Sequence, residues 1–408
     1  MHDRELYRKI LGIEAPWAVT DIEVDLNGDG VTVHIEHSRH DLVCPECGSA
    51  CPAYDTRERK WRHLDTCQYA TWLIAQVPRV QCAEHGVRQI PVPWAESNSR
   101  LTALFEALVI DWLKVATIAE VARRLKLSWP VVAGVQDRAV ARGLARRQAA
   151  QPTAISVDET AFAKRHEYVT VVSAEDRVLH VADGRSQAAL EGWYSQQDRG
   201  TLDGLRTVAM DMWAPYIRAT QAWVAQADTK IAFDRFHVAQ HLSFAVDQVR
   251  RREHKALTST GDDSLKRTRF LWLQNPGSMN RERRDALALL RRANLKTGRA
   301  WAIKEQAACL WNYRQRGWAR RAWMRWYQWA IRSRLEPIKR VARMVKKHLD
   351  GIVTAVVTGA TTARSEGFNA VIQKIKSDAR GFRNRERFRK SIYFHLGGLD
   401  LYPESLRA

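Results

Sequence analysis

The stretch Ala154-Ile155-Ser156-Val157-Asp158 is a short apolar run that ends in a carboxylate, a pattern typical of a buried strand. Two later runs repeat it, Thr207-Val208-Ala209-Met210-Asp211 and Lys230-Ile231-Ala232-Phe233-Asp234. A strand hairpin is predicted around Glu175-Asp176, and helical patterns separate the later runs. Three strands followed by alternating helices and strands predict a mixed sheet flanked by helices.

We expect this sheet to be a ribonuclease-H-like core, and the chain outside it to form further domains. From about residue 239 to 357 the strand pattern disappears, Arg and Lys abound, and six tryptophans crowd between Trp301 and Trp329. This segment is interpreted as a long helical insertion with a break at Asn275-Pro276-Gly277. Trp323, Trp326 and Trp329 are expected to fill its core; the alternative is that one tryptophan stacks on a displaced base.

Three carboxylates are the candidate catalytic residues. Asp158 and Asp211 end two of the strand runs, and Glu366 lies on the first turn of a helix predicted over 365–377. Strand ends on an open α/β sheet and a closing helix can bring such groups together, and oxygen ligands suit Mg²⁺ or Mn²⁺. A pair of these ions supports displacement at a phosphodiester. Asp234 could replace Asp211, or Asp234 and His237 could form an accessory pair.

The N-terminal part alternates apolar and polar residues in short runs and carries two pairs of metal-binding side chains, Cys44 with Cys47 and Cys82 with His85. Each pair has two residues between its members, the spacing of a zinc knuckle, so the sequence predicts a closed structural Zn²⁺ site. The alternative is that Cys51, Cys67 or His63 supplies a ligand in place of His85.

Helical spacing begins after Pro93, and two short helices over 118–125 and 129–141 meet at a turn. They predict a helix-turn-helix, although ordinary helical bundles contain the same arrangement. Candidate DNA contacts come from this motif and from the basic end of the chain. They are Arg123, Arg124, Lys126, Ser128, Gln136, Lys374, Lys376, Arg380 and Arg383.

Composition favours a polyanionic partner. The 408 residues include 65 Lys and Arg against 45 Asp and Glu, a formal net charge of +20, which favours nucleic acid over an ordinary basic surface or a membrane-binding patch. No run approaches the roughly 20 apolar residues of a membrane span, and residues 1–5 do not resemble a signal peptide. A cytoplasmic protein, associated with the nucleoid when bound to DNA, is expected, with six cysteines serving metal rather than disulfides.

The motifs together resemble the zinc-finger DDE transposases of bacterial insertion sequences, the ISL3 group. The resemblance extends over nearly the whole chain and depends on five boxes in order. They are Cys44 to Gly48, Val157-Asp158-Glu159-Thr160, Asp211-Met212-Trp213 with Pro215-Tyr216, Asp234-Arg235-Phe236-His237-Val238, and Glu366-Gly367-x-Asn369 followed by Gly381-Phe382-Arg383-Asn384. The chain departs from this pattern at Gln373 and Ser377. These departures affect the expected DNA contacts and leave the expected catalytic chemistry unchanged.

The resemblance implies a magnesium-dependent transposase with Asp158, Asp211 and Glu366 as the triad and Asp234 with His237 as an accessory box. It implies DNA as partner, both the terminal inverted repeats and the target, with a homodimer or larger assembly at synapsis. Two alternatives stay open: a non-catalytic DNA-binding regulator and a ribonuclease-H-like structure-specific nuclease. The expected domains are a zinc module (1–95), a helix-turn-helix domain (96–150), a catalytic core (151–240), a helical insertion (241–358) and the last core helix with a basic tail (359–408).

Overall fold

The computed structural model describes residues 3–25, 30–38, 40–163, 167–293, 295–360 and 363–406. The chain packs into two units. The N-terminal unit contains Met1–Gln148 together with Tyr393–His395 and Leu399–Ala408, and the central unit contains Ala149–Ile392 with Leu396–Gly398. Sequence reasoning placed residues 359–408 wholly with the catalytic core, whereas the structure packs part of this segment with the N-terminal unit.

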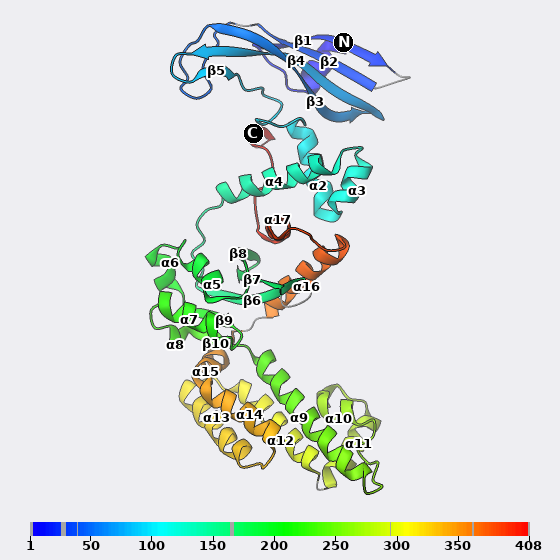
Figure 1. The fold of residues 1–408 in the computed structure, drawn as a ribbon, viewed down its shortest axis with the longest axis vertical. Coiled ribbons are helices and arrows are strands. Elements are labelled where there is room, and N and C mark those ends of the chain that lie inside the picture. Colours follow the sequence, from blue (N-terminus) through cyan, green and yellow to red (C-terminus); the bar gives the residue numbers. More distant parts are fainter. Residues whose placement is uncertain are drawn as a thin grey trace. The chain divides into compact units, whose positions relative to one another are not determined.

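The N-terminal unit begins with α1 and a five-stranded sheet of order β1-β2-β4-β3, in which β5 pairs with β4 (Figure 1). Residues alternate along β4, so that Leu73, Ala75 and Val77 are buried while the residues between them are partly exposed. The bounds are α1 Asp3–Ile10, β1 Trp17–Asp25, β2 Gly30–His37, β3 Ala53–Thr66, β4 Tyr69–Cys82 and β5 Gly86–Gln89.

Three helices follow, α2 (Ala103–Val115), α3 (Ile118–Arg124) and α4 (Trp129–Ala145). Thr117 and Glu120 form a reciprocal capping box that fixes the start of α3. Lys126 adopts a positive φ of 52° in the turn before α4. Apolar residues from all three helices form one core, which also contains Phe394 and Leu401 from the end of the chain.

The central unit contains a second five-stranded sheet of order β10-β9-β6-β7-β8. β7 runs antiparallel to both β6 and β8, whereas β9 and β10 run parallel to β6. The mixed sheet that the sequence predicted is therefore present. The bounds are β6 Ala154–Ala163, β7 Glu167–Ala174, β8 Arg177–Asp183, α5 Gln187–Tyr194, α6 Arg199–Gly204, β9 Thr207–Met210, α7 Ala214–Trp223, α8 Ala227–Lys230 and β10 Ile231–Phe233.

Helices cover both faces of this sheet. Ile155 and Val157 of β6 belong to a core with Leu190 of α5 and Tyr216 of α7. The opposite face of β6 meets α16 (Ala363–Asp378), where Gln373 Nε2 donates to Thr160 Oγ1 at 2.6 Å. On that face Phe162 also packs against Phe388 of α17 (Arg385–Leu396).

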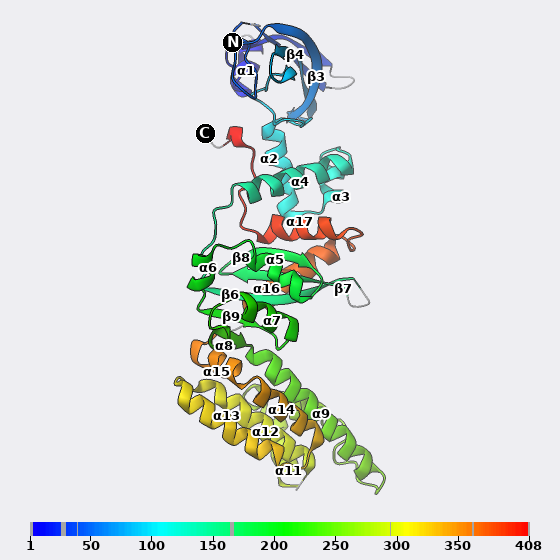
Figure 2. The same ribbon diagram turned by 60° about the vertical axis from the view of Figure 1, so that its left-hand side comes forward.

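Between β10 and α16 the described chain is helical, and this helical insertion begins at α9, directly after β10. α9, α12, α13 and α14 lie side by side, as Figure 2 shows. Asn275 caps a short 3₁₀ turn at the predicted break. The bounds are α9 Arg235–Thr258, α10 Arg269–Leu273, η1 Pro276–Ser278, α11 Arg281–Arg292, α12 Lys296–Cys309, η2 Leu310–Asn312, α13 Arg316–Ile331, α14 Glu336–Lys347 and α15 Leu349–Thr358.

Tryptophans divide between the interior and the surface of the insertion. Trp272, Trp301, Trp323 and Trp326 are buried, in agreement with the predicted core role for two of them. Trp329 is 42% exposed, so its predicted place in the core is wrong.

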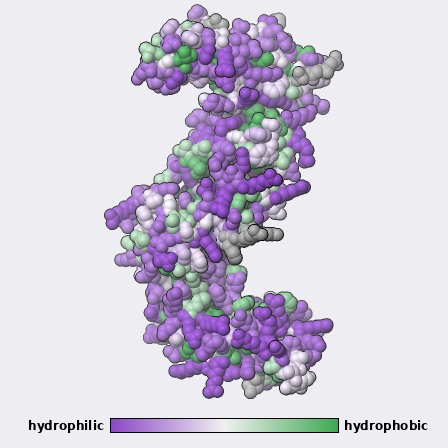
Figure 3. Space-filling view, viewed as in Figure 1, coloured by the Kyte–Doolittle hydropathy of each residue, from purple (hydrophilic) through white to green (hydrophobic). Residues whose placement is uncertain are grey.

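The face in Figure 3 is predominantly hydrophilic, and its apolar residues form small separate patches. Among the helices in the described part of the chain, none has the length and apolar character needed to cross a bilayer.

Candidate functional site

Cys44, Cys47, Cys82 and His85 form a compact cluster in the N-terminal unit. Their four ligand atoms all lie within 4.8 Å of one another. The Sγ atoms of Cys47 and Cys82 are 3.8 Å apart, and Cys82 Sγ is 3.6 Å from His85 Nδ1. Tetrahedral zinc with Zn–S bonds of about 2.3 Å requires ligand separations of roughly this size. The cluster therefore fits one closed Zn²⁺ site, and the described cysteines form no disulfide.

Neighbouring groups support this ligand set. The hydrogen bond with Ser49 is the main cause that lowers the pKa of Cys47 to about 6, which favours the thiolate that binds metal. Glu46 Oε2 lies 3.6 Å from Nε2 of His85, so it faces the ring nitrogen opposite the ligating Nδ1.

The alternative ligands lie outside this cluster. His63 is buried and bonds Thr102 through Nδ1 at 2.9 Å. Cys51 bonds the carbonyl of Ser49, and Cys67 is exposed. None of the three belongs to the group of four ligand atoms.

Asp158 and Asp211 come from adjacent parallel strands of the central sheet. Ser156 of β6 pairs with Ala209 of β9, so the same register two residues further on places Asp158 beside Asp211. Phe233 pairs with Met210, and by the same logic Asp234 lies beside Asp211. Asp211 and Asp234 thus directly follow neighbouring strands, and Asp158 lies on β6, the strand that pairs with β9.

One detail differs from the sequence expectation. Asp158 does not end its strand, because β6 continues to Ala163 in pairing with β7. Asp158 therefore reaches the site from the middle of a long strand, on the face that meets α16.

Glu366 and Asn369 approach from the first turns of α16. Asn369 Nδ2 donates to Asp158 Oδ2 at 2.8 Å, which holds the helix against the strand. The pKa of Asp158 is raised to about 6, mainly by burial and in part by the nearby charges of Asp211 and Glu366. The charge of Glu366 therefore reaches Asp158, although the side chain of Glu366 is exposed.

His237 and Asp234 have different positions in this site. His237 Nδ1 lies 3.7 Å from Asp211 Oδ1, so the imidazole faces one of the proposed ligands. Asp234 is 3% exposed and caps α9 by accepting from the backbone N–H of Phe236 at 3.1 Å. These contacts favour Asp211 over Asp234 as the second carboxylate of the centre.

Sequence reasoning missed Glu159 and Arg185. Burial raises the pKa of Glu159, the charges of Asp158 and Asp211 raise it further, and Arg185 opposes them from 3.6 Å. The guanidinium of Arg185 also lies over the rings of Tyr168 and Trp213. Glu159 adjoins Asp158 in sequence, but only the fold reveals that its side chain is partly buried beside the site.

The chemistry of this acidic site fits hard cations. Like charges gather around Asp158, and two buried acceptors, Asn369 Oδ1 and Glu159 Oε2, have no hydrogen-bond partner in the described structure. Oxygen ligands of this kind suit Mg²⁺ or Mn²⁺. Within the described ranges, only the Cys/His cluster brings three or more ligand atoms as close together as a single ion needs, so the carboxylates are adjacent without sharing one coordination shell.

The predicted DNA-contacting residues of the helix-turn-helix divide into two groups. Arg123, Arg124, Lys126 and Ser128 are exposed around the turn between α3 and α4. Gln136, by contrast, is only 4% exposed, because it lies on the face of α4 that joins the core. The sequence could not distinguish the two faces of α4, whose apolar content is high all round, and the expectation for Gln136 is contradicted.

The predicted contacts near the C-terminus also divide. Lys374, Arg380 and Arg383 are exposed, and Lys374 pairs with Asp378 at 2.7 Å. Lys376 instead donates to the carbonyl of Ala161 at 2.8 Å, so in this structure it attaches α16 to β6.

Comparison with known proteins gives a consistent result along the whole chain. A family model for ISL3 elements described as "Transposase" matches residues 155–392. Residues 42–85 match the zinc-finger of transposase IS204/IS1001/IS1096/IS1165, and residues 90–140 match the helix-turn-helix domain of transposase family ISL3.

Two relatives align over nearly their full lengths. The transposase for insertion sequence element IS1001 of Bordetella parapertussis is 26% identical over 396 residues, which is 95% of this chain and 97% of the relative. The transposase for insertion sequence element IS1557 of Mycobacterium tuberculosis is 26% identical over 424 residues, 94% of this chain and 93% of the relative.

Proposed function

Because the chain belongs to the ISL3 family of transposases, we propose that it binds the terminal inverted repeats of an insertion sequence and catalyses DNA cleavage and strand transfer. The observation that carries the proposal is the parallel register of β6 and β9 next to Asp158 and Asp211, together with the effect of the charges of Asp211 and Glu366 on Asp158. The order β8-β7-β6-β9-β10, antiparallel and then parallel, supports a ribonuclease-H-like catalytic core.

In this proposal the N-terminal unit and the central unit have different roles. The zinc ribbon and helix-turn-helix bind the element end, with Arg123, Arg124, Lys126 and Ser128 as contacts. Lys374, Arg380 and Arg383 bind DNA phosphates near the catalytic core. Synapsis of two ends requires at least a homodimer.

In the catalytic centre, Asp158, Asp211 and Glu366 would hold Mg²⁺ or Mn²⁺. A bound metal pair would activate the attacking hydroxyl and stabilise the leaving oxygen. Asn369 orients Asp158 through its amide, and Nδ1 of His237 faces Asp211. Arg185 balances part of the negative charge through Glu159.

The proposal is tested with duplex oligonucleotides that carry the element's terminal repeat. Asp158→Asn, Asp211→Asn and Glu366→Gln are each expected to lower the cleavage rate by at least about a thousandfold, because each removes charge from the metal site. Binding of the repeat, measured by fluorescence anisotropy, should change less than about threefold, since these residues lie outside the N-terminal unit.

Other results would overturn specific parts of the proposal. If Asp211→Asn cleaves normally and Asp234→Asn does not cleave, the second metal ligand is Asp234 and not Asp211. Cleavage that is indifferent to the repeat sequence would indicate a structure-specific nuclease. Repeat binding without any cleavage by the unsubstituted protein would indicate a regulator.

A further inference from the structure

One face of α13 carries tryptophans and arginines that project into solvent. Helical geometry places six of its residues within an arc of about 100°, because successive residues turn by roughly 100°. All six are exposed, and we call them the α13 stripe: Trp318, Arg321, Arg325, Gln328, Trp329 and Arg332, the last being the cap residue. Both ribbon views show α13 at the edge of the helical insertion (Figures 1 and 2).

The two tryptophans of the stripe are not part of the core. Trp318 is 52% exposed and Trp329 is 42% exposed, whereas Trp323 and Trp326 of the same helix are buried. Exposed tryptophans are unusual, because each leaves a large apolar ring in water. Since the buried pair already fills the space between helices, Trp318 and Trp329 have no packing role that explains them.

The arginines of the stripe differ from the other cations of α13 in their partners. Arg316 bonds Thr354 and Arg320 pairs with Asp350, so the other side of α13 uses its cations within the fold. In the described structure no carboxylate pairs with Arg321, Arg325 or Arg332, and α13 itself contains no acidic residue. The guanidinium of Arg321 instead lies over the ring of Trp318 at 4.3 Å.

We propose that the α13 stripe binds single-stranded DNA. Indole rings stack on unpaired bases of any sequence, and interleaved arginines neutralise the phosphates between them. Trp318 and Trp329 are eleven residues apart, about 16 Å along the helix, so they contact different nucleotides of one strand. The proposal extends the proposed function, since cleavage and strand transfer at the element ends would provide the unpaired DNA.

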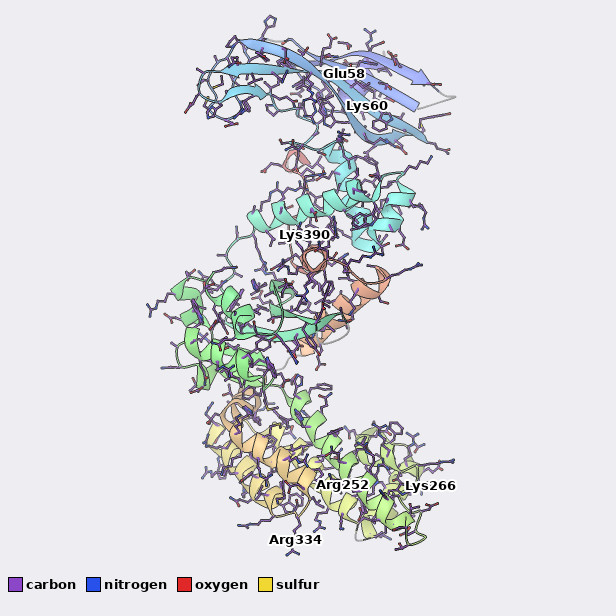
Figure 4. All side chains as sticks on the ribbon, viewed as in Figure 1. Glu58, Lys60, Arg252, Lys266, Arg334 and Lys390 are labelled. Carbon is purple, nitrogen blue, oxygen red and sulfur yellow. The ribbon has the colours of Figure 1, made fainter. Side chains whose placement is uncertain are left out.

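Charge favours this occupant over a second copy of the chain. A symmetric contact between two α13 stripes would bring arginines together without an acidic partner, which is unfavourable. Intact duplex fits less well, because its bases are enclosed and offer no face to an indole ring. Cations elsewhere on the insertion, such as Arg252, Lys266 and Arg334 in Figure 4, would attract any DNA, but they have no such pattern of interleaved tryptophans.

The experiment measures anisotropy of a labelled oligothymidylate with the full-length protein in metal-free buffer. Trp318→Ala combined with Trp329→Ala should weaken binding by about 30-fold or more, because two stacking contacts with bases are lost. Duplex binding should change less than about threefold. Both side chains are exposed, so the melting temperature should stay near that of the unsubstituted protein.

Matched controls separate stacking from general attraction. Phe244→Ala with Phe270→Ala removes two aromatics of the same insertion that are 58% and 67% exposed, and it should leave binding unchanged. Arg325→Gln should reduce the salt dependence of single-strand binding by about one phosphate contact, and Arg252→Gln should reduce it less.

Three results would overturn the proposal: unchanged single-strand affinity, an equal loss in the phenylalanine control, or a fall in sedimentation mass that reveals a subunit contact at the stripe. None of these depends on cleavage. If the proposed catalytic function is wrong, the protein with all three carboxylates in place will not cleave repeat DNA. Binding of single-stranded DNA to the α13 stripe will remain measurable in that case.

Discussion

Asn369 connects the candidate catalytic residue Asp158 to α16, the helix that carries the candidate Glu366. Its amide nitrogen bonds Asp158 Oδ2, and it lies one turn beyond Glu366 on α16. Asn369→Ala is expected to lower the cleavage rate by about tenfold and to raise the Mg²⁺ concentration needed for half-maximal rate. The reason is that the Asp158 carboxylate loses the donor that fixes its orientation. A magnesium titration of cleavage at fixed DNA measures both changes.

Gln373→Ala provides the control for this prediction. Gln373 lies one turn further along α16 and bonds Thr160, so it also attaches the helix to β6, but it does not contact Asp158. If both variants lose activity equally with no change in magnesium requirement, Asn369 acts only by docking α16, and an orienting role for its amide is wrong.

At the level of elements, the zinc cluster connects a loop of little regular structure to the short strand β5. The loop between Cys44 and Cys51 forms few backbone bonds, and β5 contains only four residues. Cys47→Ser is expected to reduce bound zinc from one ion per chain to nearly none and to lower the first thermal transition by about 10 °C or more. Elemental analysis of the purified protein and calorimetry measure these changes.

Cys67→Ser tests the competing ligand assignment. Cys67 is exposed in the turn between β3 and β4, outside the ligand cluster, so its replacement should leave zinc content and melting unchanged. Loss of zinc in this variant, with retention in Cys47→Ser, would show that the four-residue cluster is not the metal site.

The helices and strands also show which parts of the fold could be predicted from the sequence. Apolar runs ending in Asp211 and Asp234 predicted β9 and β10, since a buried parallel strand is apolar on both faces. The end of β6 was missed because its later residues, around Thr160, are half polar and do not continue the apolar run. Knuckle spacing predicted the zinc cluster, because four soft ligands in two short pairs have few other uses.

Properties that depend on distant packing could not be predicted. Whether Gln136 faces solvent depends on which side of α4 meets its neighbours, and the hydrophobic pattern of α4 does not distinguish its faces. The α13 stripe was hidden for a similar reason, since buried Trp326 and exposed Trp329 differ only in their side of one helix.

On the scale of the whole molecule, the N-terminal unit is completed by the end of the chain. Leu401 is buried in the core of the helix-turn-helix, and its carbonyl accepts from Arg142 Nη2 at 2.7 Å. Arg146 donates to the carbonyl of Tyr402 at 2.7 Å. The segment Leu399–Leu406 therefore acts as a strap on α4, more than 250 positions away in sequence.

Gly143 of α4 is the position where this strap is most sensitive. A Cβ atom at Gly143 would lie 2.7 Å from Leu399 Cβ, closer than real contacts allow. Gly143→Ala should therefore destabilise the N-terminal unit by about 1–3 kcal/mol, as overpacking does, and weaken repeat binding.

Gly134→Ala, in the same helix but with only an ordinary contact to Arg138, should stabilise it by roughly 0.5–1 kcal/mol, because alanine favours helix more than glycine does. Calorimetry of both variants, beside a chain truncated after Gly398, measures the effect. The strap predicts opposite signs for the two glycines and a loss on truncation that resembles Gly143→Ala, whereas equal stabilisation by both alanines would show that the tail does not pack on α4 in solution.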